Sequence, residues 1–158
     1  MFNPIPTARD VTTIDAIPTR AAGYAHDTVT LGWEDRVKAR ARRQSDGGFA
    51  FATALARGTI LREGHCLVFD IPPLIVRVVE LAEPVLVVRP RAQTEWALFA
   101  YHIGNSHQPM MLAEDGIVCP DYLGMSQVLG YYDIPFSREA RPFTPVSQVP
   151  SHRHQLAR

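Results

Sequence analysis

The sequence predicts an α+β protein in which a small all-β domain precedes a domain that mixes strands and helices. Apolar and polar residues alternate from Thr28 to Arg43, as they do in a strand with one buried face. Helical spacing replaces this alternation in TEWALFAYHIGN, residues 94–105. We therefore place the domains at residues 1–82 and 83–145, followed by a tail at residues 146–158 that lacks apolar periodicity and is expected to be mobile.

Turn residues predict two hairpins in the N-terminal domain. The sequence SDGG, residues 45–48, supplies glycines that tolerate positive φ, and the alternation resumes after it at Phe49 and Phe51. A second hairpin is predicted in GTILREGHCLVF, residues 58–69, with its turn at Glu63-Gly64. Short strands joined by tight turns are typical of a small sandwich or barrel-like unit.

Four basic residues share the polar face of the first predicted strand: Arg36, Lys38, Arg40 and Arg42. This basic stripe is either a solvated strand face, which also protects against edge pairing, or a docking surface for an acidic protein. Nucleic acid is a poorer partner, because Glu34 and Asp35 offset the charge and the face has no aromatic residues for stacking.

The second half of the chain predicts a split βαβ arrangement. A strand-like run that is interrupted near Ala82 precedes a helix, for which Thr94 is the expected N-cap and Gly104 or Asn105 the left-handed stop. Short strands are expected at MML and GIV, a second helix in DYLGMSQVLGYY, and a last strand near residues 140–143. This order of elements is that of a split βαβ domain.

Composition excludes several classes of protein. Sixteen basic and sixteen acidic side chains cancel, so no overall field attracts nucleic acid or an anionic membrane. No run of eighteen apolar residues and no signal peptide pattern occurs, and we expect a cytoplasmic protein without a membrane partner. Cys66 and Cys119 are far apart and lack a C-x-x-C neighbour, which favours two reduced thiols over a disulfide or a zinc finger.

The histidines are the candidate functional residues. His102 falls in the last turn of the predicted helix and His107 beyond its end, so the pair does not have the i, i+4 spacing that places two ligands on one helix face. One interpretation makes His102 a half-buried structural residue and His107 an ordinary loop histidine. The other is metal binding, because His152 and His154 on the tail offer imidazoles that can complete a coordination sphere supplied elsewhere.

The stretch AYHIGNSHQP, residues 100–109, resembles the signature Tyr-His-Leu-Gly-Asn-Arg-His of the UreE urease accessory proteins, a family of nickel metallochaperones. Other segments agree with the family in the same order: VTLGWEDRVKARARR with SDGG, then LARGTILREGHCL, VVELAEPVLVV and ARPFTP before a histidine-containing tail. The resemblance covers nearly the whole chain, from about Val29 to His154. It identifies the chain as a member of this family.

The resemblance implies an N-terminal β domain that handles protein contacts and a ferredoxin-like βαββαβ domain that binds nickel(II). It also implies a homodimer in which His107 of each protomer reaches one metal at the interface, since a two-fold axis presents the same residue twice. His152 and His154 are further expected ligands, while His102 is a weaker candidate better suited to a supporting role. Zinc(II) or copper(II) are alternatives at the same site.

The sequence also departs from the family pattern. Ser106 stands where the family usually has Arg, and His65 where it usually has Asp, a change that we interpret as a turn substitution. Cys119, Asp121 and Tyr122 occupy a region where some members carry additional histidines, so accessory metal sites are not expected. Cys119 is interpreted as a small buried hydrophobe, with a soft metal ligand as the alternative if its thiol is exposed.

The expected function is delivery of nickel to the urease apoprotein complex, with the urease accessory GTPase as a partner, both implied by the resemblance. The alternative is a protein-interaction scaffold of the urease assembly complex whose metal binding is incidental. A metal-dependent hydrolase is disfavoured, because the chain has no H-E-x-x-H motif and no carboxylate beside either central histidine. We therefore expect no catalytic activity.

Overall fold

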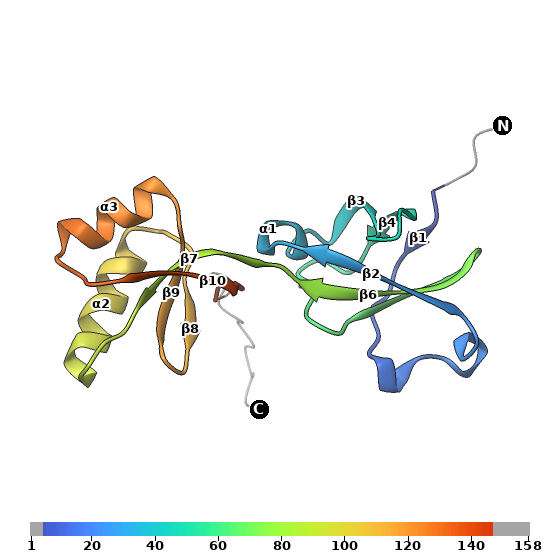
Figure 1. The fold of residues 1–158 in the computed structure, drawn as a ribbon, viewed down its shortest axis with the longest axis horizontal. Coiled ribbons are helices and arrows are strands. Elements are labelled where there is room, and N and C mark those ends of the chain that lie inside the picture. The colour runs from blue at the N-terminus through green and yellow to red at the C-terminus, as the bar shows by residue number, and fades with distance from the viewer. Residues whose placement is uncertain (1–4, 147–158) are drawn as a thin grey trace, which may run out of the picture. The chain divides into compact units, whose positions relative to one another are not determined.

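The computed structural model describes residues 5–146. The chain divides into two compact units, with the boundary between Glu83 and Pro84. Figure 1 shows the helices and strands of each unit. Among the described residues no helix has both the length and the apolar character needed to cross a membrane. The predicted mobile tail, with His152 and His154, lies outside the described residues apart from its first position.

The N-terminal unit consists mainly of strands. Its strands are β1 (Thr7–Ala8), β2 (Ala25–Leu31), β3 (Arg40–Gln44), β4 (Ala50–Ala54), β5 (Cys66–Asp70) and β6 (Pro73–Glu80). They form two three-stranded sheets with the orders β1-β4-β3 and β2-β6-β5. Two short 3₁₀ helices, η1 (Ile14–Ala16) and η2 (Thr19–Ala21), and the four-residue helix α1 (Trp33–Arg36) connect the strands.

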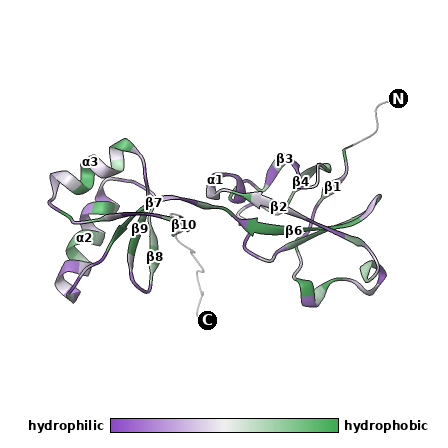
Figure 2. Ribbon diagram, viewed as in Figure 1, coloured by the Kyte–Doolittle hydropathy of each residue, from purple (hydrophilic) through white to green (hydrophobic). Residues whose placement is uncertain are grey.

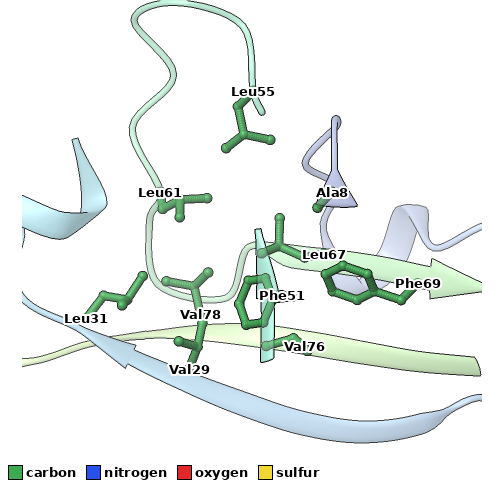
Figure 3. Close-up of a cluster of buried hydrophobic side chains, with 10 residues drawn as sticks. All are labelled: Ala8, Val29, Leu31, Phe51, Leu55, Leu61, Leu67, Phe69, Val76 and Val78. Atoms are coloured by element: carbon green, nitrogen blue, oxygen red, sulfur yellow. The ribbon is translucent and has the colours of Figure 1, made fainter. Parts of the chain in front are cut away.

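One apolar cluster joins the two sheets of this unit. Alternation along the strands sends Phe51 of β4 and Phe69 of β5 into the interior, where their rings meet edge to face at 5.3 Å (Figure 3). The other buried members are Ala8, Val29, Leu31, Leu55, Leu61, Leu67, Val76 and Val78. This core is what the period-two pattern of the sequence predicts.

The single strand predicted from Thr28 to Arg43 is wrong, because the chain turns inside it. β2 ends at Leu31, and α1 follows with the Trp33 amide donating to Glu83 Oε2 at 2.8 Å. A helical turn rotates each side chain by about 100° rather than 180°, so the basic residues no longer share one face. Arg36 is fully buried.

The predicted basic stripe is therefore wrong for the two residues before β3. Lys38, in the connection after α1, pairs with Asp35 at 2.9 Å, and Arg36 faces the interior. Only Arg40 and Arg42 remain exposed on the outer face of β3.

The first predicted hairpin is confirmed and the second is wrong. β3 and β4 pair antiparallel around the 45–48 turn, where Gly48 has φ +94°. The segment before β5 does not pair with β5, because Leu61 donates its amide to Arg36 of α1 and Gly64 donates to Val78 of β6. β5 instead forms a hairpin with β6, in which Asp70 lies opposite Pro73.

The C-terminal unit has the ferredoxin-like βαββαβ fold. Its elements are β7 (Ala82–Val88), α2 (Gln93–Asn105), β8 (Met111–Ala113), β9 (Gly116–Pro120), α3 (Leu123–Tyr131) and β10 (Ser137–Pro142). The sheet order is β10-β7-β9-β8, and β9 runs antiparallel to both β7 and β8. The predicted α+β class is confirmed.

The two helices of this unit cover a buried sheet face. Leu86, Val88, Ile117 and Cys119 of the central strands pack against Ile103 of α2 and against Met125 and Leu129 of α3. Figure 2 shows the hydrophobic character of β9, whose five residues are all buried. Gly116 opens this strand where an added Cβ would lie 2.2 Å from the Val88 carbonyl oxygen, so no larger residue fits there.

The ends of α2 differ from the prediction. The helix begins at Gln93 with Ala92 as its N-cap, because the Glu95 carboxylate accepts a hydrogen bond from the Arg91 amide at 2.6 Å and extends the first turn upstream of Thr94. At the other end neither Gly104 nor Asn105 takes the left-handed conformation. That conformation belongs to His107.

Candidate functional site

His107 stands immediately after the cap of α2 in a left-handed backbone conformation, with φ +56°. Its amide donates to the Gly104 carbonyl at 3.0 Å, and Ser106 closes the last turn with a hydroxyl bond of 2.6 Å to the Ile103 carbonyl. A side chain in this conformation costs about 1 kcal/mol relative to glycine, the residue that usually occupies it. The fold therefore holds a strained backbone at a residue whose side chain is exposed to solvent.

Two hydrogen bonds from outside the α2–β8 loop hold the residues that follow His107. The Tyr122 hydroxyl donates to Gln108 Oε1, and the Val146 amide donates to the Met110 carbonyl at 2.8 Å. Tyr122 is the N-cap of α3, and Val146 follows β10. The loop that carries the exposed imidazole is therefore hydrogen-bonded to the start of α3 and to the segment that follows β10.

His102 occupies the last turn of α2 and is half-buried. Its ring stacks on Tyr132, with 3.9 Å between ring centroids and 20° between ring planes, and meets Tyr101 edge to face at 5.4 Å. Five positions separate it from His107, and the two imidazoles do not belong to a common cluster. The geometry gives His102 a packing partner at the end of α3.

The two thiols and His65 are structural. Burial among apolar side chains raises the pKa of the Cys119 thiol to about 12, which disfavours the thiolate that binds metals. Cys66 is also fully buried, and burial raises the pKa of its thiol. His65 Nδ1 accepts a hydrogen bond from the Arg62 amide at 3.1 Å, as expected for a residue that shapes a turn.

Within residues 5–146 no three histidine, cysteine or acidic side chains come together in a group that could hold a metal ion. His107 by itself offers one imidazole on an accessible surface. A single donor binds a metal weakly, so a site built on His107 needs ligands from the tail or from a second copy of the chain.

Sequence reasoning missed the residues that hold the loop after His107 in place. Gln108 lies within the recognisable segment and Met110 directly follows it, but their partners Tyr122 and Val146 are far along the chain. The sequence placed Tyr122 inside the predicted helix DYLGMSQVLGYY, whereas in the structure it is the N-cap of α3. Its bond to Gln108 depends on the packing of α2 against α3, which no local pattern encodes.

Two protein-family domains match consecutive parts of this chain. The profile of the UreE urease accessory protein N-terminal domain matches residues 9–80, and that of the UreE C-terminal domain matches residues 83–157. The chain belongs to the UreE family of urease accessory proteins. The two family domains correspond to the two units described above.

Individual relatives carry the same description. The urease accessory protein UreE of Paraburkholderia xenovorans is 34% identical over 129 residues, which cover 80% of this chain and 57% of the relative. That of Burkholderia vietnamiensis is 40% identical over 87 residues, covering 55% and 43%, and that of Rhodopseudomonas palustris strain HaA2 is 30% identical over 135 residues, covering 81% and 62%. The chain thus spans less than two thirds of the length of each of these relatives.

Proposed function

We propose that this protein is a cytoplasmic metallochaperone of urease maturation that binds nickel(II) through His107 at the interface of a homodimer. The ion is cargo, which the protein passes on toward the urease apoprotein complex, with the urease accessory GTPase as a partner. Membership of the UreE family supports the role in urease maturation. The single observation that carries the metal site is the exposed, left-handed His107 on its anchored loop.

A second copy of the chain supplies what one protomer lacks. Two-fold symmetry brings the same exposed residue from both protomers to one point, so two His107 imidazoles can meet on the axis. Exposed apolar and aromatic side chains lie on the two helices of the same unit: Leu98, Tyr101, Leu123 and Tyr131. Such side chains favour association over exposure to water.

The C-terminal tail starts close to the loop that carries His107. Val146 is hydrogen-bonded to Met110, which follows His107 by three positions. His152 follows Val146 by six positions in the sequence, and a chain of six residues spans at most about 20 Å, so the sequence separation allows tail histidines to reach the same ion. This supports tail histidines as exchangeable ligands that leave the ion accessible to an acceptor.

The donor set suits nickel(II), and zinc(II) and copper(II) are competing ions. Imidazole nitrogens bind all three, and selectivity among them follows from geometry and availability more than from affinity. Both thiols are buried, so a nitrogen-rich site is expected. No catalytic step is assigned to the protein.

The proposal is tested by nickel titration calorimetry of the full chain at neutral pH. We expect tight binding by the wild type, loss of the tight site in His107→Ala, and weaker binding in a His152→Ala/His154→Ala double variant. His26→Ala is the matched control, because His26 is an exposed histidine of the other unit. Tight binding that survives in His107→Ala would refute the central residue of the proposal.

A protein-interaction scaffold with incidental metal binding is the second candidate. The exposed pair Arg40 and Arg42 on β3 favours it, because two guanidinium groups on one strand face suit an acidic partner. In this case, an Arg40→Ala/Arg42→Ala variant would lose association with the urease assembly complex while its nickel binding stayed unchanged. The metallochaperone proposal instead expects His107→Ala to lose nickel binding while its association with the urease assembly complex stays unchanged.

A further inference from the structure

Tyr122, which lies outside the α2–β8 loop, contacts the residue that directly follows His107. Its hydroxyl donates a hydrogen bond to Oε1 of Gln108, the residue directly after His107. We infer that the Tyr122–Gln108 pair is a positioning device that sets the direction of the His107 imidazole and thereby the affinity for the metal. This inference rests on the proposed nickel site and adds to it two residues that do not themselves bind the ion.

Hydrogen bonds hold the backbone of Tyr122 and of its neighbour in place. It caps α3 with an extended backbone, and its carbonyl accepts the Met125 amide at 3.0 Å and the Ser126 amide at 3.3 Å. The preceding residue, Asp121, donates its amide to Pro84 at 3.0 Å and accepts a hydrogen bond from Arg138 of β10 at 3.0 Å. The hydroxyl therefore projects from a junction that is bonded to β10 and to β7.

His107 needs an external anchor because its own backbone conformation is unfavourable. A left-handed non-glycine residue persists only where the surroundings hold it. On the helix side Ser106 and Gly104 provide hydrogen bonds, and on the strand side the Gln108 side chain is tied to Tyr122. Without that tie the segment can relax toward right-handed or extended backbone conformations, which point the imidazole elsewhere.

Because the proposed site is shared by two protomers, a small displacement of the His107 imidazole has a larger effect on nickel affinity. Each metal–imidazole bond has a narrow range of length and direction, and in a two-fold site both imidazoles move together when the loop moves. Outer residues that orient metal ligands commonly change affinity by about tenfold or more when they are removed. Loss of one hydroxyl that touches no metal is thus expected to weaken nickel binding.

The test uses Tyr122→Phe, Gln108→Leu and the double variant in the full chain, with nickel affinity measured by calorimetry and the thermal midpoint by circular dichroism. We expect each single variant to bind nickel about tenfold more weakly, with the thermal midpoint nearly unchanged. The double variant should be no weaker than either single variant, because one interaction is lost in all three. Tyr24→Phe is the matched control, since it removes a tyrosine hydroxyl that donates a hydrogen bond to Asp70 Oδ1 at 2.9 Å in the N-terminal unit.

The outcomes separate this inference from the proposed function. Tight binding in the wild type and its loss in His107→Ala, together with wild-type affinity in Tyr122→Phe, would overturn the positioning role and leave the nickel site standing. Additive losses in the double variant would also overturn it, because the two residues would then act independently. If the wild type and His107→Ala bind nickel alike, the proposed site fails and the inference fails with it.

Discussion

The imidazole of His102 lies flat on the ring of Tyr132, with 3.9 Å between their centroids. This contact links the last turn of α2 to the residue that caps the end of α3. It gives a half-buried histidine a packing role that needs no metal. His102 therefore differs from His107, whose side chain is exposed beyond the helix end.

We predict that His102→Phe keeps the nickel affinity of the wild type, because a phenyl ring preserves the stacking on Tyr132. His102→Ala should lower the free energy of unfolding by about 1 kcal/mol through loss of the aromatic pair. Calorimetry with nickel and urea unfolding of both variants make the comparison. A tenfold loss of affinity in His102→Phe would instead make His102 a ligand.

The left-handed backbone conformation of His107 leads to a second prediction. Replacing His107 by glycine or by alanine removes the same imidazole, but only glycine adopts φ +56° without strain. We expect His107→Gly to be more stable than His107→Ala by about 1 kcal/mol in urea unfolding. At Ser106, which has φ −78°, the order of the glycine and alanine variants should be reversed.

Arg36 carries the third prediction. Its buried guanidinium donates to Glu80 Oε1 at 2.9 Å and to the Leu61 carbonyl at 3.2 Å, which ties α1 to β6 and to the loop before β5. Arg36→Ala leaves Glu80 without this partner and should destabilise the N-terminal unit by about 3 kcal/mol in denaturant unfolding. Arg40→Ala, a change at an exposed arginine, should stay within about 0.5 kcal/mol of the wild type.

Local patterns predicted the fold where a period extends over a whole element. Alternation gave the 45–48 hairpin and the apolar face that includes Phe51, and helical spacing gave α2 and α3. Pattern failed between Thr28 and Arg43, where a helix of only four residues breaks the period and turns Arg36 inward. A helix that short is stabilised by distant partners such as Glu80, which alternation does not register.

The candidate site was predictable only in part for the same reason. The segment YHIGNSH directed attention to His107. The left-handed residue that ends the helix, however, was predicted at Gly104 or Asn105, because glycine and asparagine adopt that conformation most readily. The structure places this conformation two to three positions later, because α2 continues through Asn105 and is capped by Ser106. Tyr122 was not predicted, since its contact depends on tertiary packing.

A network of alternating charges joins three segments of the C-terminal unit. Arg141 of β10 contacts Asp115, in the β8–β9 turn, through two bonds of 2.9 and 2.7 Å. Arg89, which follows β7, contacts Glu139 of β10 at 2.6 Å. Arg141 also lies 2.6 Å from Glu139, so each carboxylate has two guanidinium partners.

These contacts predict a loss of stability in acid. The Arg141 guanidinium, as the largest cause, holds the pKa of Asp115 well below its ordinary value. Hydrogen bonds, the strongest from Arg89, lower the pKa of Glu139 from 4.5 to about 2. A carboxyl with a lowered folded-state pKa contributes stability that is fully present above its unfolded pKa and disappears as pH falls toward the folded value.

We therefore expect Arg141→Gln to lower the thermal midpoint at pH 7, and the difference from the wild type to shrink as pH falls from about 4.5 toward 2. Thermal unfolding followed by circular dichroism at a series of pH values measures this difference. Arg91→Gln removes the same charge from an exposed residue outside the network and should show little difference at any pH. Because the network is partly exposed, added salt should reduce the effect of Arg141→Gln at pH 7. A difference that stays constant from pH 7 to pH 2 would mean that Arg141 stabilises the unit through packing of its side chain and not through the two carboxylates.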